Sequence, residues 1–229
     1  MKKFFLTGIL LSAVGIINVA ADTDNPFLKQ KQQARINEEV NSDLQAARNG
    51  NKIAQYNMGV RYLRGEDGIT KDPSQAVLWF SKAAEQGLSA AANALGVCYE
   101  KGNGVEQSYT MAVKWYRKAA AQNNTYAIRN LGICYFLGWG VEKSNFKAVR
   151  MFNKAALKKD ATAQYFLALC YEAGLGVGEN KFEAKKWYYK SARQGHRKAL
   201  EWVRKRAGQG DTEAQRLLEK IEAEEEEEE

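Results

Sequence analysis

Residues 91–120 read AANALGVCYEKGNGVEQSYTMAVKWYRKAA, and this pattern occurs four times along the 229-residue chain. The copies of its first half begin at Ala54, Ala91, Ala127 and Ala163, and those of its second half begin at Ala76, Ala112, Ala148 and Ala184. The step is 36 residues, apart from one extra residue in the first loop. Four copies in register predict a repeat architecture.

Each half of the pattern predicts a helix. In the first half, Leu95, Gly96 and Tyr99 form an apolar stripe that returns in the other copies. A glycine inside a helix costs up to about 1 kcal/mol, so its recurrence indicates close approach of a neighbouring helix. The second half follows a good N-cap residue in every copy: Asp72, Ser108, Ser144 and Asn180.

One such unit cannot bury both of its apolar stripes, so successive units must stack. The predicted fold class is therefore all-α, a right-handed α-α superhelix built as a solenoid of helix-turn-helix repeats.

The aligned copies give A-x-x-x-L-G-x-x-Y-x-x-G-x-G-V, a polar cap and then A-x-x-W-x-x-K-A-A-x-x-G. Over roughly residues 50–195 this motif resembles the Sel-one-like repeat (SLR) family, a tetratricopeptide-like (TPR-like) group with exported bacterial members. Ala168 replaces the glycine in one copy and Met151 replaces the tryptophan in another. The resemblance implies a binding scaffold whose first helices line a concave groove.

The N-terminus has the pattern of a secretory signal peptide. Lys2 and Lys3 precede an apolar run that ends in Val19-x-Ala21. The run is shorter than the roughly 20 residues that span a bilayer. We therefore expect cleavage near Ala21 and a periplasmic or secreted protein without stable membrane insertion, the alternative being an uncleaved anchor.

The sequence divides into nine expected segments. These are a signal peptide (1–21), a disordered lead-in (22–32), an N-terminal capping helix (33–49), repeats 1 to 4 (50–86, 87–122, 123–158 and 159–195), a degenerate C-terminal capping repeat (196–223) and an acidic tail (224–229).

The charge is uneven along the chain. Lysine and arginine number 34 against 27 acidic residues, and seven of those acids are Glu222 and Glu224–Glu229. A basic body attracts acidic proteins, lipid headgroups, cell-wall polymers or nucleic acid. Export argues against nucleic acid. We expect a monomer that binds a protein or peptide, with an acidic partner as one option.

Cys98, Cys134 and Cys170 occupy the same position in three copies. Equivalent positions on packed helices are about 8–10 Å apart, whereas a disulfide needs Cα atoms within about 7 Å. We therefore predict three buried free thiols.

Catalytic patterns are weak. His196 is the single histidine, which argues against histidine-based triads and zinc sites. Ser144-x-x-Lys147 matches a motif of penicillin-recognising enzymes but lacks its companion motifs. We predict no catalytic residue, metal or cofactor. The alternative is an enzyme acting on cell-wall material or β-lactams through Ser144, Glu100 or Glu172.

The predicted partner-binding residues lie on the first helices and face the groove. One position on these helices varies from copy to copy, as expected of a position that recognises a ligand. Its occupants are Tyr56, Asn93, Arg129 and Tyr165. The predicted set is Tyr56, Asn93, Glu100, Arg129, Phe136, Tyr165 and Glu172. Trp139, in a tight loop, is either a loop contact or a partner contact. The predicted function is an exported interaction scaffold serving as an immunity, envelope or virulence factor.

Overall fold

The computed structural model describes residues 26–226, with side chains to Glu224. The predicted signal peptide and residues 22–25 lie outside this range, as do residues 227–229. Within it the chain is all-α. The helices are α2 (Pro26–Arg48), α3 (Lys52–Arg64), α4 (Pro73–Glu85), α5 (Ser89–Lys101), α6 (Tyr109–Ala121), α7 (Thr125–Leu137), α8 (Asn145–Ala156), α9 (Ala161–Ala173), α10 (Lys181–Ala192), α11 (Arg197–Gly208) and α12 (Thr212–Glu226).

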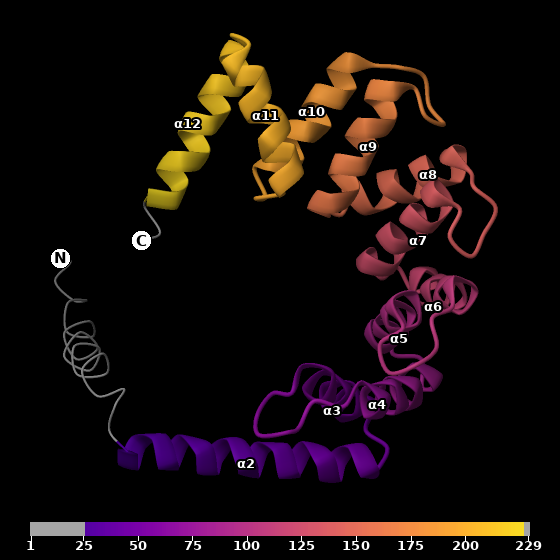
Figure 1. Ribbon diagram of the computed structural model, residues 1–229, viewed down its shortest axis with the longest axis vertical. Helices are drawn as coiled ribbons and strands as arrows, with labels where there is room; N and C mark the ends of the chain where they lie inside the picture. The colour runs from indigo at the N-terminus through magenta and orange to yellow at the C-terminus, as the bar shows by residue number, and fades with distance from the viewer. Residues whose placement is uncertain (1–25, 227–229) are drawn as a thin grey trace, which may run out of the picture.

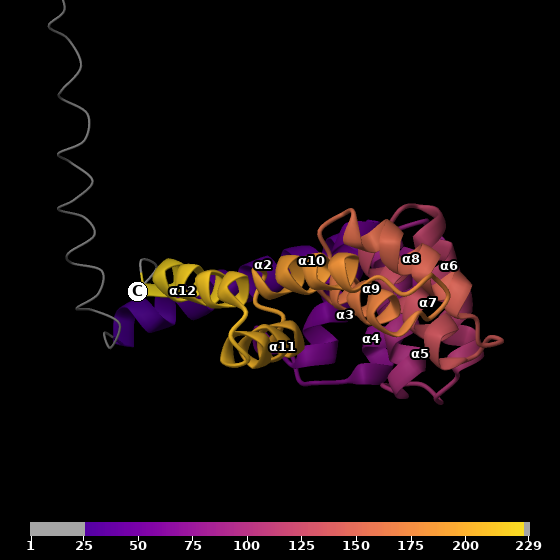
Figure 2. The ribbon, with the colours of Figure 1, turned by 90° about the horizontal axis from the view of Figure 1, so that it is seen from above.

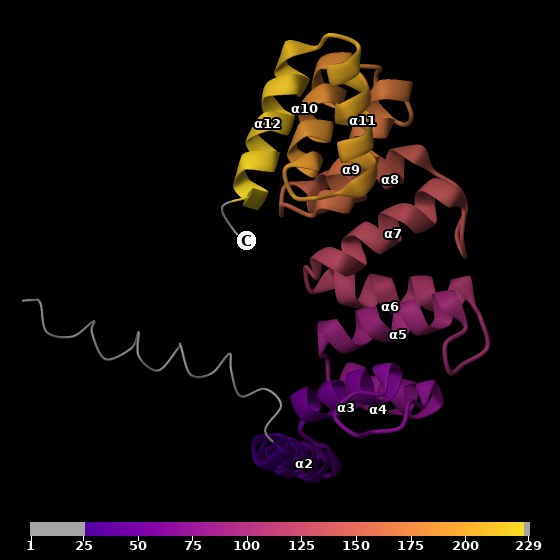
Figure 3. The same cartoon turned by 60° about the vertical axis from the view of Figure 1, so that its left-hand side comes forward.

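Helices α3 to α10 form four hairpins that stack along an open arc (Figure 1), and Figure 3 shows the stack from another side. Each helix packs on the one before it and the one after it in the chain. We call α3, α5, α7 and α9 the inner helices, because they line the inner side of the arc, and α4, α6, α8 and α10 the outer helices. The predicted all-α solenoid is confirmed.

The repeated glycines of the inner helices lie against aromatic rings of the outer helices with which they pair. A Cβ atom on Gly96 would lie 2.6 Å from the Tyr116 ring, and one on Gly132 would lie 2.7 Å from the Phe152 ring. Tyr116 and Phe152 are fully buried. These two glycines therefore give room to the buried aromatic rings of α6 and α8, as the close-approach argument predicts.

The loops between paired helices also fix the stacking of successive repeats. Gly140 has φ +66°, and a Cβ there would lie 2.3 Å from the carbonyl carbon of Tyr109 in the preceding repeat. The outer helices begin where predicted, because Asp72, Ser108, Ser144 and Asn180 each accept a backbone N–H bond as N-caps.

The flanks are more helical than predicted. Residues 26–32 belong to α2 where a disordered lead-in was expected, and Glu224–Glu226 continue α12 where the acidic tail was expected to follow the capping repeat. The physical reason is composition: Leu, Lys, Gln, Ala and Glu are strong helix formers, and neither segment contains a break. Both helices extend toward the open side of the arc (Figure 2).

Helix α2 is held at its C-terminal end. Arg61 of α3 pairs with Asp43 of α2 and, at 2.9 Å, with Asp67 in the following loop. Ala47 is the residue of α2 that is fully buried. No described helix is both long and apolar enough to cross a bilayer.

The three cysteines are free and almost completely buried, as predicted. Burial raises the pKa of the Cys98 and Cys170 thiols to about 11 and that of Cys134 to about 12. They therefore pack as small apolar side chains at neutral pH.

Candidate partner-binding surface

The predicted partner-binding residues all lie on inner helices. The structure places Tyr56 on α3, Asn93 and Glu100 on α5, Arg129 and Phe136 on α7, and Tyr165 and Glu172 on α9. Glu172 is exposed and the other six are half-buried. The set is thus accessible in part and distributed over four successive repeats.

The position that varies between copies (Tyr56, Asn93, Arg129 and Tyr165) contacts the following repeat in three of the four copies, which the sequence pattern did not indicate. Arg129 donates to Asp160, the N-cap of α9, at 3.0 Å, and Tyr165 stacks on His196, the N-cap of α11, with ring centroids 4.7 Å apart. Asn93 accepts from Asn130 of α7 at 3.2 Å. These side chains therefore bridge neighbouring repeats while they line the inner surface.

A second inner position alternates in chemistry along the arc. Its occupants, in repeats 1 to 4, are Leu63, Glu100, Phe136 and Glu172. The core position of the outer helix follows the same alternation with Phe80, Tyr116, Phe152 and Tyr188. Glutamate is thus matched with tyrosine, and an apolar residue with phenylalanine.

The polar pairs of this alternation are hydrogen-bonded. The Tyr116 hydroxyl donates to Glu100 Oε2 at 2.8 Å, and the Tyr188 hydroxyl donates to Glu172 Oε2 at 2.7 Å. Burial first, and then the neighbouring carboxylate, raises the pKa of both tyrosines, so each hydroxyl keeps its proton. Each glutamate is therefore held at the edge of the core with acceptor capacity left for another group.

Glu172 has a further partner from the fifth helix pair. Trp202 of α11 donates from Nε1 to Glu172 Oε1 at 3.1 Å and stacks on Tyr188 at a centroid distance of 4.2 Å. Lys181 and Arg206 line the same cleft. At the repeat 4 end of the inner surface, the Glu172 carboxylate is therefore held by two donors and lies in a cleft.

Ser144, one residue of the enzyme alternative, has a structural role, and so does the single histidine. Ser144 Oγ accepts from the Lys147 backbone N–H at 3.3 Å as a helix cap, and His196 Nδ1 accepts from the Ala199 N–H at 3.3 Å. Trp139 stacks on Tyr109 at a centroid distance of 4.9 Å, a loop contact between repeats. Among the described residues, no three His, Cys, Asp or Glu side chains are grouped as metal ligands.

The positive charge of the repeats lies in the outer layer. The outer helices carry eleven lysines and arginines against two glutamates, Glu85 and Glu183. The inner helices carry five against two. Two of those five, Arg61 and Arg129, are paired with aspartates. The excess of basic charge therefore lies away from the inner surface.

The Sel1 repeat family model matches residues 52–88, 89–124, 125–160 and 161–196. Each match starts at or next to the first residue of an inner helix and covers one hairpin. Because the four matches together span more than half of the chain, the protein belongs to the Sel1 repeat family. Members of this family generally mediate protein–protein interactions, and the family is generally non-enzymatic.

Solved structures agree with this assignment. A Sel1 repeat protein from Oxalobacter formigenes is 33% identical over 80% of this chain and 75% of its own, with a TM-score of 0.73. A protective antigen of uropathogenic Escherichia coli strains, displaying an SLR fold, is 34% identical over 77% of this chain, with a TM-score of 0.66.

The present chain spans 42% of the length of the E. coli structure. A sel1 repeat protein from Klebsiella pneumoniae, 20% identical over 80% of this chain and 99% of its own, shares the fold at a TM-score of 0.53. The search of curated proteins gave no matching relative.

Proposed function

We propose that the protein is an exported interaction scaffold that binds a segment of a partner protein along the inner surface of its arc. The observation that carries this proposal is the alternation of Leu63, Glu100, Phe136 and Glu172 on successive inner helices. The core residues behind these positions alternate in the same way, so the inner surface presents apolar and acidic side chains in a fixed order. Such an order can distinguish one partner segment from another.

The same alternation specifies the chemistry of the partner. Leu63 and Phe136 offer half-buried apolar surface, whereas Glu100 and Glu172 offer oriented carboxylates. A segment that suits this surface presents apolar side chains in alternation with lysine, arginine or N–H donors. An acidic partner fits the outer helices better, because they carry most of the positive charge.

Binding through the inner surface is tested with two matched double variants. Affinity isolation from the extract of the native compartment, followed by a salt wash, should recover a partner with the unmodified chain. Glu100→Gln/Glu172→Gln should weaken recovery at least about tenfold, since charged hydrogen bonds are worth about 1.5–3 kcal/mol each. Glu106→Gln/Glu142→Gln, which removes equal charge from exposed loop positions, should leave recovery unchanged. Equal effects of both double variants would contradict the proposal.

Export rests on the sequence of residues 1–21, which lie outside the described residues. Fractionation of cells expressing the full chain, with N-terminal sequencing, should find a soluble exported product that begins at Asp22. A product that starts at Met1 and remains in the membrane fraction would instead support an uncleaved anchor.

The partner decides which process the scaffold serves. We propose an immunity, envelope or virulence role, because each uses an exported protein that binds another protein. A toxin recovered on the inner surface would select the immunity role, and an envelope component would select the assembly role. We propose no reaction for Glu100, Glu172 or Ser144, and turnover of peptidoglycan or a β-lactam that these residues support would overturn that assignment.

A further inference from the structure

The outer helices of repeats 3 and 4 share a feature that partner binding at the inner surface does not use. Phe146 in α8 and Phe182 in α10 occupy the same repeat position, the second after the N-cap, and their exposed fractions are 64% and 76%. Ser74 and Thr110 occupy this position in α4 and α6. Two neighbouring repeats thus present an aromatic ring to solvent at equivalent points.

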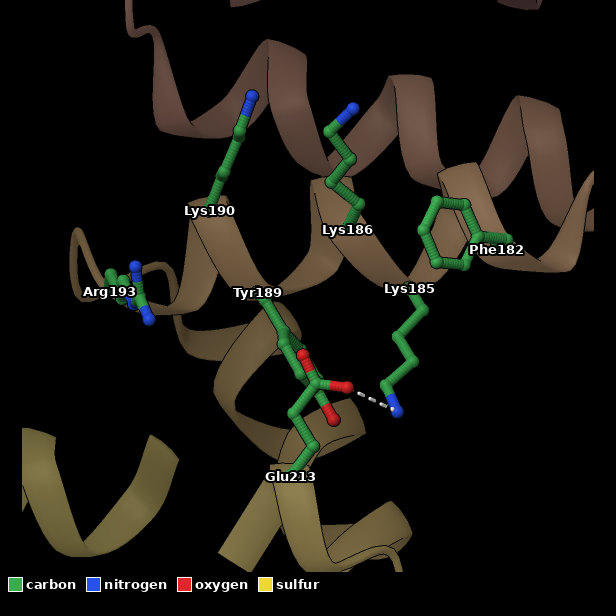
Figure 4. A pocket seen from close by; sticks show the side chains of 7 residues that line it. All are labelled: Phe182, Lys185, Lys186, Tyr189, Lys190, Arg193 and Glu213. Atoms are coloured by element: carbon green, nitrogen blue, oxygen red, sulfur yellow. Dashed lines mark ion pairs between the residues drawn. The ribbon is translucent and has the colours of Figure 1, made fainter. Parts of the chain in front are cut away.

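Exposed cations follow each ring on the same helix face. Arg150 and Lys154 lie four and eight residues after the first ring, and Lys186 and Lys190 lie at the same distances after the second. Figure 4 shows Lys186 and Lys190 projecting from one side of α10, whereas Lys185 projects toward Glu213 on the other. The rings and cations therefore form one surface, the outer basic face, defined by Phe146, Arg150, Lys154, Phe182, Lys186 and Lys190.

This face has little acidic compensation. Arg150 and Lys154 have no ion-pair partner among the described residues, and α8 contains no acidic residue. Lys186 pairs with Glu183 at 3.2 Å, and Lys190 lies 4.2 Å from the centroid of the Trp187 ring.

Lys185, by contrast, is neutralised by Asp211 at 3.0 Å and Glu213 at 2.8 Å. On the outer basic face, Arg150 and Lys154 therefore remain available to a partner, and Lys186 shares its charge with one carboxylate where Lys185 shares its charge with two.

We propose that the outer basic face binds the surface of an anionic lipid membrane peripherally. Phenylalanine rings that enter the headgroup boundary and cations that meet lipid phosphates are the two contributions that hold a protein at such a surface. Isolated exposed apolar side chains are common and need no explanation. Here the rings recur at one repeat position, and each is followed four residues later by a cation and eight residues later by the lysine that all four outer helices carry. The ring with a cation four residues later occurs in repeats 3 and 4.

The shape of the molecule fits a membrane better than it fits an acidic polypeptide. A plane that touches the outer side of an arc meets a small number of adjacent repeats, and the combined feature is confined to the adjacent repeats 3 and 4. An acidic polypeptide would engage the cations, but it would give no role to two largely exposed phenylalanine rings. Binding through this face would also leave the inner surface free for a protein partner.

Vesicle co-sedimentation tests the proposal. Wild type and variants carry the same N-terminus, so residues 1–21 contribute equally. We expect binding to vesicles of equimolar phosphatidylglycerol and phosphatidylcholine, and at least about tenfold weaker binding to phosphatidylcholine alone. Arg150→Gln/Lys186→Gln should reduce affinity about 25-fold, or about fivefold per cation, and less at high salt, where screening is strong. Phe146→Ser/Phe182→Ser should reduce it at least about tenfold at both low and high salt.

Arg204→Gln/Lys205→Gln is the matched control, because it removes the same charge from exposed positions of α11. This variant should bind within about twofold of wild type, and circular dichroism should show the same helix content for all variants. An equal loss in the control would show that net charge alone attracts the protein, and would overturn the proposal.

A polyglutamate peptide tests the alternative class of partner. Vesicle binding that survives the phenylalanine variant, together with tight polyglutamate binding that depends on Arg150 and Lys186, would assign the face to acidic polypeptides and overturn the lipid proposal. Weak polyglutamate binding with loss of vesicle binding in both face variants would support it.

Discussion

The hydroxyl of Tyr116, a fully buried residue of α6, donates to Oε2 of Glu100 on α5 at 2.8 Å. This bond joins the two helices of repeat 2 at the edge of the inner surface. It fixes a carboxylate that would otherwise be free to turn toward solvent. Repeat 4 contains the same pair, whereas repeat 1 combines Leu63 with Phe80 at the equivalent positions.

Replacing Tyr116 by phenylalanine should destabilise the protein. The half-buried carboxylate of Glu100 loses its donor, and a hydrogen bond to a charged group contributes about 1.5–3 kcal/mol. Urea unfolding monitored by circular dichroism measures the change in the free energy of unfolding.

The control is Tyr116→Phe/Glu100→Leu, which reproduces the apolar pair of repeat 1. Because both polar partners are removed together, the double variant should recover most of the lost stability. A double variant that is less stable than Tyr116→Phe would show that the bond is not the source of the effect.

Gly140→Ala should be more damaging than a typical loop substitution. The residue has φ +66°, which costs an alanine about 1–2 kcal/mol, and its Cβ would meet the Tyr109 backbone at 2.3 Å. Gly195→Ala shares the positive φ, at +74°, but has open space around it. Thermal unfolding should show a melting temperature several degrees lower for Gly140→Ala than for Gly195→Ala. Equal shifts would mean that the loop does not fix the stacking of repeats.

The three thiols should resist alkylation in the folded protein. Burial raises their pKa to about 11 or 12, so the reactive thiolate is scarce below that pH. Iodoacetamide at pH 7 to 9, read by mass spectrometry, should modify none of them natively and all three after denaturation. Rapid modification of one thiol in the native protein would contradict its assignment as a core residue.

Asp211 should make stability depend on pH in the acid range. Lys185 is the main reason that its pKa is lowered to about 2, so the folded state favours the carboxylate. The contribution is therefore present above about pH 4, the unfolded value, and is lost as the pH falls toward 2.

Asp211→Asn keeps an acceptor for the Ala214 N–H but removes the charge. It should cost a few tenths to about 1 kcal/mol at pH 7 and nothing near pH 2, as denaturant unfolding at both pH values would show. A cost that is equal at both pH values would assign the effect to the helix cap instead.

Features that repeat in the sequence could be predicted from it. The N-caps, the helix-interior glycines and the buried cysteines each recur at one position, and local geometry suffices to interpret them. The pairing of glutamate with tyrosine was missed, although Glu100 with Tyr116 and Glu172 with Tyr188 vary together across copies. A comparison of variable positions with each other, rather than position by position, is the signal that would have found it.

Contacts between repeats were harder to predict. Arg129 with Asp160 and Tyr165 with His196 each join a variable inner position to the N-cap of the helix two further along the chain. These partners are 31 residues apart in the sequence and differ in chemistry, so no periodic signal connects them. The early start of α2 differs from the prediction for another reason: its first residues are mostly polar, which is typical of disorder, but most of them are also strong helix formers.

Binding at the inner surface is tested most sharply by locating the protein partner on the solenoid. A photo-crosslinking amino acid is placed at Val97 or Phe136 on the inner helices, and at Thr110 or Asn153 on the outer helices as controls. If the partner binds the inner surface, it should crosslink from the inner positions and not from the outer ones. Crosslinks confined to the outer positions would contradict this binding mode.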